Sequence, residues 1–250
     1  MSSLAIFGDS YADPRTGDLG ELSWVDLIDR KNLFNIKNFS YTGSSLWYSY
    51  KLFLDHHQEF DKIIFLVTAP NRLTVPIDSN LKVWNHLNYQ QAKVYVGMTE
   101  SIQQTHYKLI VDYYEHIHDS HKDDSMHRLM VDSVMKIRPD AIVYPCFDFD
   151  YIKEFPLYNI TKFEDQYIGI TDSKRIELYK NGIRDSRSCH MTEANNGVVA
   201  DMFLSRLDNV ESNLDLGKLV IPNRDLNYYY QSKFFEPYNY FKKLAADGND

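Results

Sequence analysis

Ser10 ends a tight Gly-Asp-Ser turn that directly follows the apolar run 4–7, so its hydroxyl is expected at the end of a buried strand. A serine becomes a nucleophile when a general base and donors for an oxyanion converge on it. The chain offers His190 as a base, and the Gly43 backbone N–H and the Asn71 side-chain amide as donors. These residue types could together supply a nucleophilic serine, its base and its oxyanion donors.

Four short segments rich in Ile, Val, Phe or Tyr are typical of the buried strands that would position these residues: 4–7, 34–39, 62–68 and 141–147. Ser23 is a plausible N-cap for a helix that follows it. Apolar residues at helical spacing predict further helices over 46–60, about 99–136 and 194–207. Strands that alternate with helices predict a parallel sheet with helices on both faces, an α/β fold. Ligands bind such sheets at the carboxyl ends of the strands, where Ser10, Gly43 and Asn71 are expected.

The candidates occur in the chain order serine, glycine, asparagine, histidine, and each follows or precedes a predicted core element. In that order they resemble the SGNH (GDSL-type) hydrolase family. Its nucleophile block is matched by Gly8-Asp9-Ser10-Tyr11, its second block by Asn38 with Gly43, its third by Asn71 and its last by His190. The resemblance covers roughly residues 3 to 208. It implies a three-layer α/β/α sandwich with a mostly parallel, flavodoxin-like sheet.

The resemblance also implies a serine esterase that works without a metal or an organic cofactor. Ser10 would attack the ester carbonyl, while His190 would take its proton and later give it to the leaving alcohol. The backbone N–H groups of Ser10 and Gly43 and the Asn71 side chain would form the oxyanion hole.

The match departs from the family pattern beside the histidine. The family usually has an aspartate three residues before it, where this chain has Arg187, a cation that cannot accept the imidazole N–H. We expect Asp185 to orient the ring instead and to complete a triad. The alternative is a backbone carbonyl, which would leave a Ser-His dyad.

The third block departs as well. Family members commonly read Gly-x-Asn-Asp, whereas this chain has Ala69-Pro70-Asn71-Arg72. We expect Arg72 to be a solvated loop arginine. The alternative is contact with an anionic substrate.

A different class of function is a catalytically degenerate SGNH domain that binds a glycan or serves in an assembly. Arg187 favours that alternative, whereas the intact set of Ser10, Gly43, Asn71 and His190 argues against it. For an enzyme, an acylated carbohydrate is the first substrate class to test, because aromatic clusters can stack on sugar rings. The clusters are 47–50 and 228–230, and core packing is their alternative role.

Histidines and carboxylates gather in one helical stretch and invite a metal interpretation: His116, His118, His121, Asp112, Asp119, Asp123 and Asp124. Zinc needs ligands that converge on one point, and of the three histidines only His118 and His121 have suitable helical spacing. We therefore predict a solvated, charged segment and no metal site. Cys189, next to His190, is expected to be a small packing residue.

Composition limits partners and compartment. A net charge of −8 disfavours a nucleic-acid-binding protein, and no apolar run approaches the length needed to span a membrane. Without a recognisable signal peptide or a disulfide framework, a cytoplasmic, reducing compartment is expected. We expect one domain over 1–208, with an excursion at 76–97, and an extension over 209–250 that is disordered at its end. The oligomeric state is left open.

Overall fold

The computed structural model describes residues 1–13, 22–41, 43–70, 72–78, 83–87, 102–157, 160, 191, 193–208 and 211–219. The chain divides into two compact units. The first consists of Met1–Thr16 and Leu33–Phe147, and the second of Gly17–Asn32 and Asp148–Asp250. Among the described helices, none is both long and apolar enough to cross a membrane. The predicted extension over 209–250 is described only at 211–219, so its packing stays a prediction.

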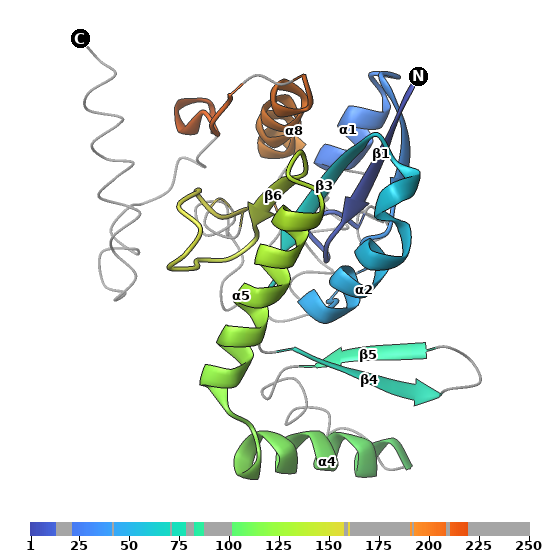
Figure 1. The fold of residues 1–250 in the computed structure, drawn as a ribbon, viewed down its shortest axis with the longest axis vertical. Helices are drawn as coiled ribbons and strands as arrows, with labels where there is room; N and C mark the ends of the chain where they lie inside the picture. Colours follow the sequence, from blue (N-terminus) through green and yellow to red (C-terminus); the bar gives the residue numbers. More distant parts are fainter. Residues whose placement is uncertain are drawn as a thin grey trace, which may run out of the picture. The chain divides into compact units, whose positions relative to one another are not determined.

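The first unit is built on a four-stranded parallel sheet (Figure 1). Its strands are β1 (Ser2–Phe7), β2 (Phe34–Asn38), β3 (Lys62–Val67) and β6 (Ile142–Pro145). They lie in the order β2-β1-β3-β6, with every neighbouring pair parallel. The four predicted strands and the α/β class are therefore confirmed.

The two central strands are buried because their sequences are apolar without interruption. Leu4–Phe7 of β1 and Ile63–Val67 of β3 are at most 1% exposed, as expected for strands covered on both faces. The chain leaves β1 on one side to form β2 and returns on the other side to form β3. This reversal makes the carboxyl end of β1 a topological switch point, where ligands bind in open α/β sheets.

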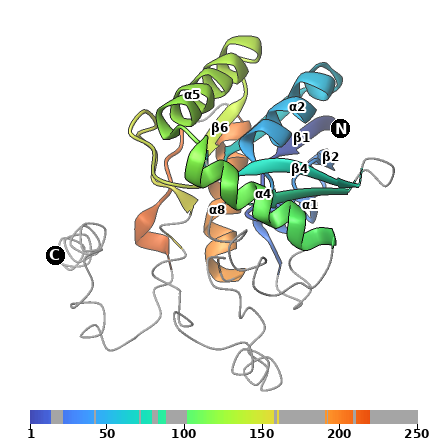
Figure 2. The same ribbon diagram turned by 90° about the horizontal axis from the view of Figure 1, so that it is seen from below.

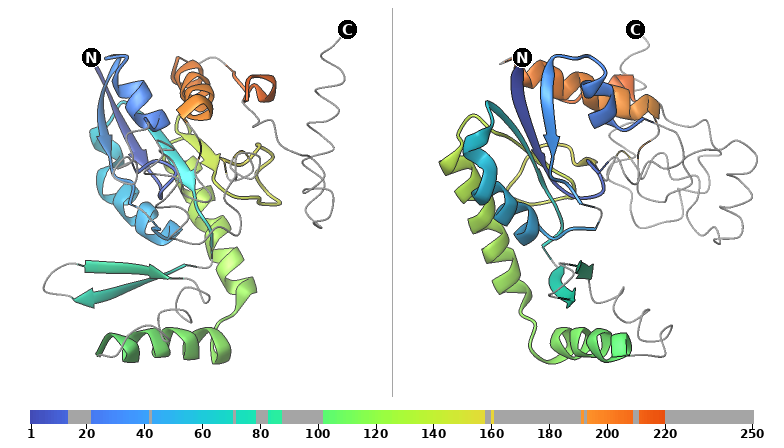
Figure 3. Two further views of the ribbon diagram at one scale, coloured as in Figure 1. Left: turned by 180° about the vertical axis from the view of Figure 1, so that it is seen from behind. Right: turned by 90° about the vertical axis from the view of Figure 1, so that its right-hand side faces the viewer.

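Two helices of this unit, α2 (Leu46–His56) and α5 (Ser120–Ile137), pack beside each other, α2 against β1 and α5 against β6 (Figure 3). Ser45 caps the start of α2 by accepting a hydrogen bond from the Tyr48 N–H. Phe53 anchors α2 on the sheet through edge-on contacts with the rings of Phe7 and Phe65. The predicted helix over 46–60 is confirmed as α2 followed by the short 3-10 helix η2 (His57–Glu59).

An antiparallel hairpin, which overlaps the start of the excursion predicted over 76–97, and the helix that follows it come next in the chain. The hairpin pairs β4 (Leu73–Asp78) with β5 (Val83–Leu87), and α4 (Ile102–His116) packs beside it through Ile110 and Leu73 (Figure 2). The helical stretch predicted over 99–136 is two helices, because Asp119 accepts hydrogen bonds from the N–H groups that begin α5.

The second unit contains α1 (Trp24–Asp29) and α8 (Glu193–Leu207), which pack on each other. Ser23 and Asp26 form a capping box at the start of α1, which confirms the predicted cap. The rings of Trp24 and Phe203 lie 4.6 Å apart, and the Trp24 N–H donates to Asn196. A 3-10 helix, η3 (Leu216–Lys218), follows α8.

Candidate active site

Ser10 lies on a single helical turn that begins directly after β1. The Asp9 carbonyl accepts hydrogen bonds of 3.1 Å from the N–H groups of Ala12 and Asp13, and these close the turn. The first N–H groups of such a turn have no partner within it, and Ser10 supplies one of them. Ser10 is partly exposed, and within the described part of the chain its hydroxyl makes no hydrogen bond. The hydroxyl is therefore available to a ligand at this edge of the sheet.

Asp9, the residue before the candidate nucleophile, is completely buried. Its carboxylate accepts hydrogen bonds from the Tyr11 N–H at 3.1 Å, from Arg72 Nη1 at 3.2 Å and from Cys146 Sγ at 3.7 Å. Burial raises the pKa of Asp9 above its ordinary value, and the Arg72 charge and the Tyr11 N–H oppose that rise. All three neighbours donate, which suits an ionised carboxylate.

Arg72 is the counter-ion of Asp9 and is not a solvated loop arginine, so that prediction is wrong. Its side chain is only 15% exposed. Nη1 also donates to the Ser44 carbonyl oxygen at 3.2 Å, and the guanidinium carbon lies 5.8 Å from the centre of the Phe147 ring. Sequence reasoning missed this contact because 63 positions separate the two charged residues.

Asn38 joins the end of β2 to the turn of Ser10. Its Nδ2 donates to the Ala12 carbonyl oxygen at 2.6 Å, and its Oδ1 accepts from the Ser40 N–H at 2.9 Å. Both groups of the amide are therefore used in holding backbone. This contact accounts for an asparagine at the position that resembles the family's second block.

Gly43 lies on the loop between β2 and α2, and its backbone has φ = +73°. Residues other than glycine rarely adopt this backbone conformation, because their Cβ atom makes it unfavourable. The backbone at position 43 therefore favours glycine. An added Cβ would meet no atom within 4 Å, which leaves the space over Gly43 open. The next residue, Ser44, donates its hydroxyl to the Gly8 carbonyl at 2.8 Å and fixes the loop beside the end of β1.

The loop after β3 is attached to the same place. The Thr68 hydroxyl lies 3.3 Å from the Ser44 carbonyl oxygen, and the Thr68 carbonyl lies 2.7 Å from Nε2 of the buried His127 on α5. Burial lowers the pKa of His127 below its ordinary value, against the opposing effect of that hydrogen bond. Neutral His127 therefore donates to Thr68, a supporting role for which the sequence gives no signal. Asn71 lies outside the described residues, between Pro70 and Arg72.

His190, Asp185, Arg187 and Cys189 also lie outside the described residues, so their roles stay predictions. Met191, the residue after His190, is described and is buried. Its carbonyl accepts a hydrogen bond from Asn196 Nδ2 at 3.1 Å, and α8 begins two residues later. The helix predicted after the histidine is thereby confirmed.

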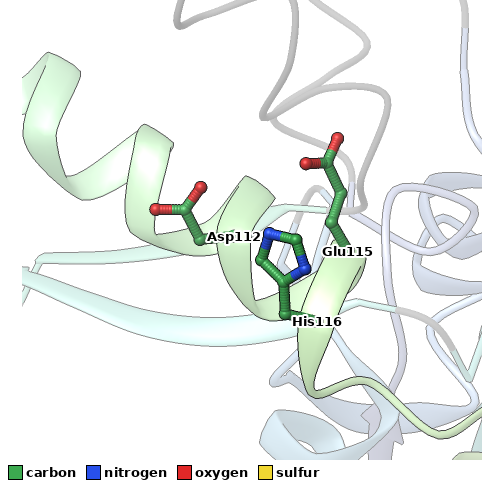
Figure 4. Close-up of side chains that lie close together, drawn as sticks. All are labelled: Asp112, Glu115 and His116. Carbon is green, nitrogen blue, oxygen red and sulfur yellow. The ribbon is translucent and has the colours of Figure 1, made fainter.

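Asp112, Glu115 and His116 lie close together on α4, with one potential ligand atom from each within 4.8 Å of the others (Figure 4). Helical spacing of three and four residues accounts for their proximity. His118 does not join this group, because its Nε2 lies 2.8 Å from Asp123 Oδ2. Glu115 and His116 are exposed, and exposed groups of this kind are common without an ion. We assign this cluster no metal.

The comparisons with known proteins give little further information. No model of a protein family matches the chain, and no curated protein matches it. One similar solved structure is an acetyl xylan esterase, AlAXEase, with a TM-score of 0.35 and 14% sequence identity over 81% of this chain and 98% of that one.

Proposed function

We propose that the protein is a serine-dependent hydrolase of carboxylic esters, with Ser10 as the nucleophile. The observation that carries the proposal is the position of Ser10. Its hydroxyl has no hydrogen-bond partner among the described residues and lies on a turn at the carboxyl end of β1, the switch point of a parallel sheet. Gly43, with its left-handed backbone, is on the neighbouring loop.

In the proposed reaction, Ser10 Oγ bonds to the ester carbonyl carbon while His190 takes the hydroxyl proton. The negative charge on the carbonyl oxygen is held by the N–H groups of Ser10 and Gly43 and by the Asn71 amide. The tetrahedral intermediate then expels the alcohol, to which His190 returns the proton. Water, deprotonated by the same imidazole, then attacks the carbonyl carbon of the acyl-serine. The imidazolium returns the proton to Ser10 Oγ as the acid is released.

The proposal includes an SGNH-type, three-layer sandwich over 1–208, with Asp185 orienting His190. An acetylated carbohydrate is the substrate class to test first. Two aromatic residues within four positions of Gly43 in the sequence support this choice, because Tyr41 is 41% exposed and Trp47 is 52% exposed. Exposed aromatic rings of this kind offer flat apolar faces to a sugar.

The test is reaction of the purified protein with p-nitrophenyl acetate and with a fluorophosphonate, followed by intact mass and peptide mapping. We expect one phosphonyl group per chain, located on Ser10, and loss of both labelling and turnover in Ser10→Ala. Ser125→Ala is the control, because the Ser125 hydroxyl donates to the carbonyl of His121 within its own helix. A folded wild type that is not labelled would contradict the proposal and favour the degenerate, glycan-binding alternative, which Arg187 supports.

A further inference from the structure

Arg72 is fixed by three neighbours that lie far from it in the sequence. Its guanidinium contacts the Asp9 carboxylate after β1, the Ser44 carbonyl after β2 and the Phe147 ring after β6. Arg72 itself follows β3. One cation therefore joins the loops at the carboxyl ends of all four strands of the sheet.

The electrostatic situation of Asp9 gives this cation a specific task. A completely buried carboxylate is costly unless it is paired and hydrogen-bonded. Among the described residues, the titratable or charged side chains that act on Asp9 are Arg72 and Cys146, and burial raises the pKa of the Cys146 thiol well above its ordinary value. The thiol is therefore neutral at physiological pH, and Arg72 supplies the compensating charge. The hydroxyls of Ser44 and Ser49 are neutral and donate to the carbonyl of Gly8, the residue before Asp9.

Asp9 in turn determines the geometry around Ser10. Its carboxylate accepts the Tyr11 N–H, and its carbonyl accepts the N–H groups of Ala12 and Asp13. Ser10 stands between these bonded groups, so a rotation of the Asp9 side chain would remove one of the hydrogen bonds that hold the turn around Ser10. Protonation of Asp9 would weaken its hydrogen bond with Tyr11 and its pairing with Arg72.

We propose that Arg72 is a positioning residue, which keeps Asp9 in place as a carboxylate and thereby holds the turn that presents Ser10. The proposal rests on the proposed function, because it assigns Ser10 the nucleophilic role. It adds a residue that touches neither substrate nor reacting atoms but acts on them through Asp9.

The experiment measures the rate of fluorophosphonate labelling, and kcat and KM for p-nitrophenyl acetate, as functions of pH. At neutral pH, Arg72→Gln is expected to slow labelling and kcat by about ten- to a hundredfold through misplacement of the nucleophile, with KM changing much less. The acidic limb of the profile is the loss of rate as the pH falls, to which protonation of the proposed base His190 contributes in every variant. Without the guanidinium the pKa of Asp9 rises further, so this limb should move to higher pH than in the wild type. Arg72→Lys keeps the charge and should return the limb towards the wild-type position.

The double variant Asp9→Asn/Arg72→Gln separates the electrostatic role from a packing role. Asparagine can still accept the Tyr11 N–H but does not titrate, so the shift of the acidic limb should disappear. The proposal is overturned if the profile of Arg72→Gln superimposes on that of the wild type, or if the double variant shows the same shift as Arg72→Gln.

Arg138→Gln is the matched control. Arg138 lies in the same unit, its side chain is 16% exposed, and it pairs with Asp140 while donating to the carbonyls of His57 and Phe60. Its loss should lower stability without moving the acidic limb. An equal shift in Arg138→Gln would show that general destabilisation moves the limb, and would overturn the specific role of Arg72.

Urea unfolding distinguishes failure of this inference from failure of the proposed function. A folded wild type that reacts with neither reagent would overturn the proposed function and, with it, the catalytic part of this inference. The claim that Arg72 keeps Asp9 ionised would then stand only if Arg72→Gln lowers the free energy of unfolding more at about pH 7 than at about pH 5. The double variant should show no such dependence on pH.

Discussion

The Ser44 hydroxyl donates a 2.8 Å hydrogen bond to the Gly8 carbonyl oxygen, and so ties the loop after β2 to the residue that follows β1. Ser44 is completely buried, and its own carbonyl oxygen lies within hydrogen-bond distance of the Thr68 hydroxyl and of Arg72. One serine therefore connects the loops that follow three neighbouring strands. The candidate site owes its shape to these connections.

Ser44→Ala should lower the free energy of unfolding by about 1 kcal/mol, because a buried hydrogen bond is lost. The cost stays low because the Gly8 carbonyl still accepts from the Tyr41 N–H and the Ser49 hydroxyl. Urea unfolding measures the change. Ser125→Ala, which removes an exposed bond within α5, should stay within about 0.5 kcal/mol of the wild type. Equal losses in the two variants would contradict the anchoring role of Ser44.

His127 should make stability depend on pH. Burial lowers its pKa in the folded protein below 6.5, although the Thr68 carbonyl and the Asp124 charge favour protonation. The unfolded chain therefore binds this proton more tightly, and the stability that neutral His127 contributes is lost as the pH falls below about 6.5. In His127→Gln the decrease in unfolding free energy between about pH 7 and pH 5 should be smaller than in the wild type.

Exposed His121 on the same helix provides the control, and His121→Gln should keep the wild-type dependence on pH. The measurement is a series of urea titrations across that range. An unchanged slope in His127→Gln would show that His127 does not titrate differently in the folded and unfolded chains.

Two glycine substitutions should change stability in opposite directions. Gly43→Ala forces alanine to φ = +73° and should cost about 1 to 2 kcal/mol, although an added Cβ meets no neighbouring atom. Gly197 lies inside α8 with equally open space, so Gly197→Ala should stabilise the fold by about 0.5 to 1 kcal/mol through helix propensity. Thermal unfolding compares the two.

The reactivity of the Gly43 variant tests the proposed oxyanion hole as well. A shifted Gly43 backbone would misdirect its N–H, so fluorophosphonate labelling of Ser10 should slow in Gly43→Ala and stay unchanged in Gly197→Ala. If Gly43→Ala loses stability but is labelled at the wild-type rate, the Gly43 N–H is not part of the oxyanion hole.

The sheet could be predicted from the sequence because strands buried on both faces consist of uninterrupted apolar residues. Leu4–Phe7 and Ile63–Val67 contain only apolar residues, and both segments are buried in the centre of the sheet. Once the strands are known, the rule for parallel sheets places Ser10 and Gly43 at one edge. These predictions needed only local periodicity.

The remaining features depend on contacts that local periodicity does not report. The hairpin of β4 and β5 includes Pro76, a residue that disfavours strands, and the two strands stabilise each other by pairing. Asp119 ends one helical pattern and begins another, a capping signal that helical spacing alone does not show. The ion pair of Asp9 with Arg72 forms because β1 and β3 are neighbours in the sheet.

The role of Asp185 distinguishes a catalytic triad from a Ser-His dyad. The test compares Asp185→Asn with His190→Ala, the variant of the proposed base. If Asp185 fixes the tautomer of His190, Asp185→Asn should lower kcat for p-nitrophenyl acetate by about a thousandfold or more, close to the loss in His190→Ala. Asp208→Asn, after the end of α8, is the control and should leave kcat unchanged. A much smaller loss in Asp185→Asn than in His190→Ala would instead indicate a dyad whose imidazole is oriented by a backbone carbonyl, since Arg187 cannot accept the ring N–H.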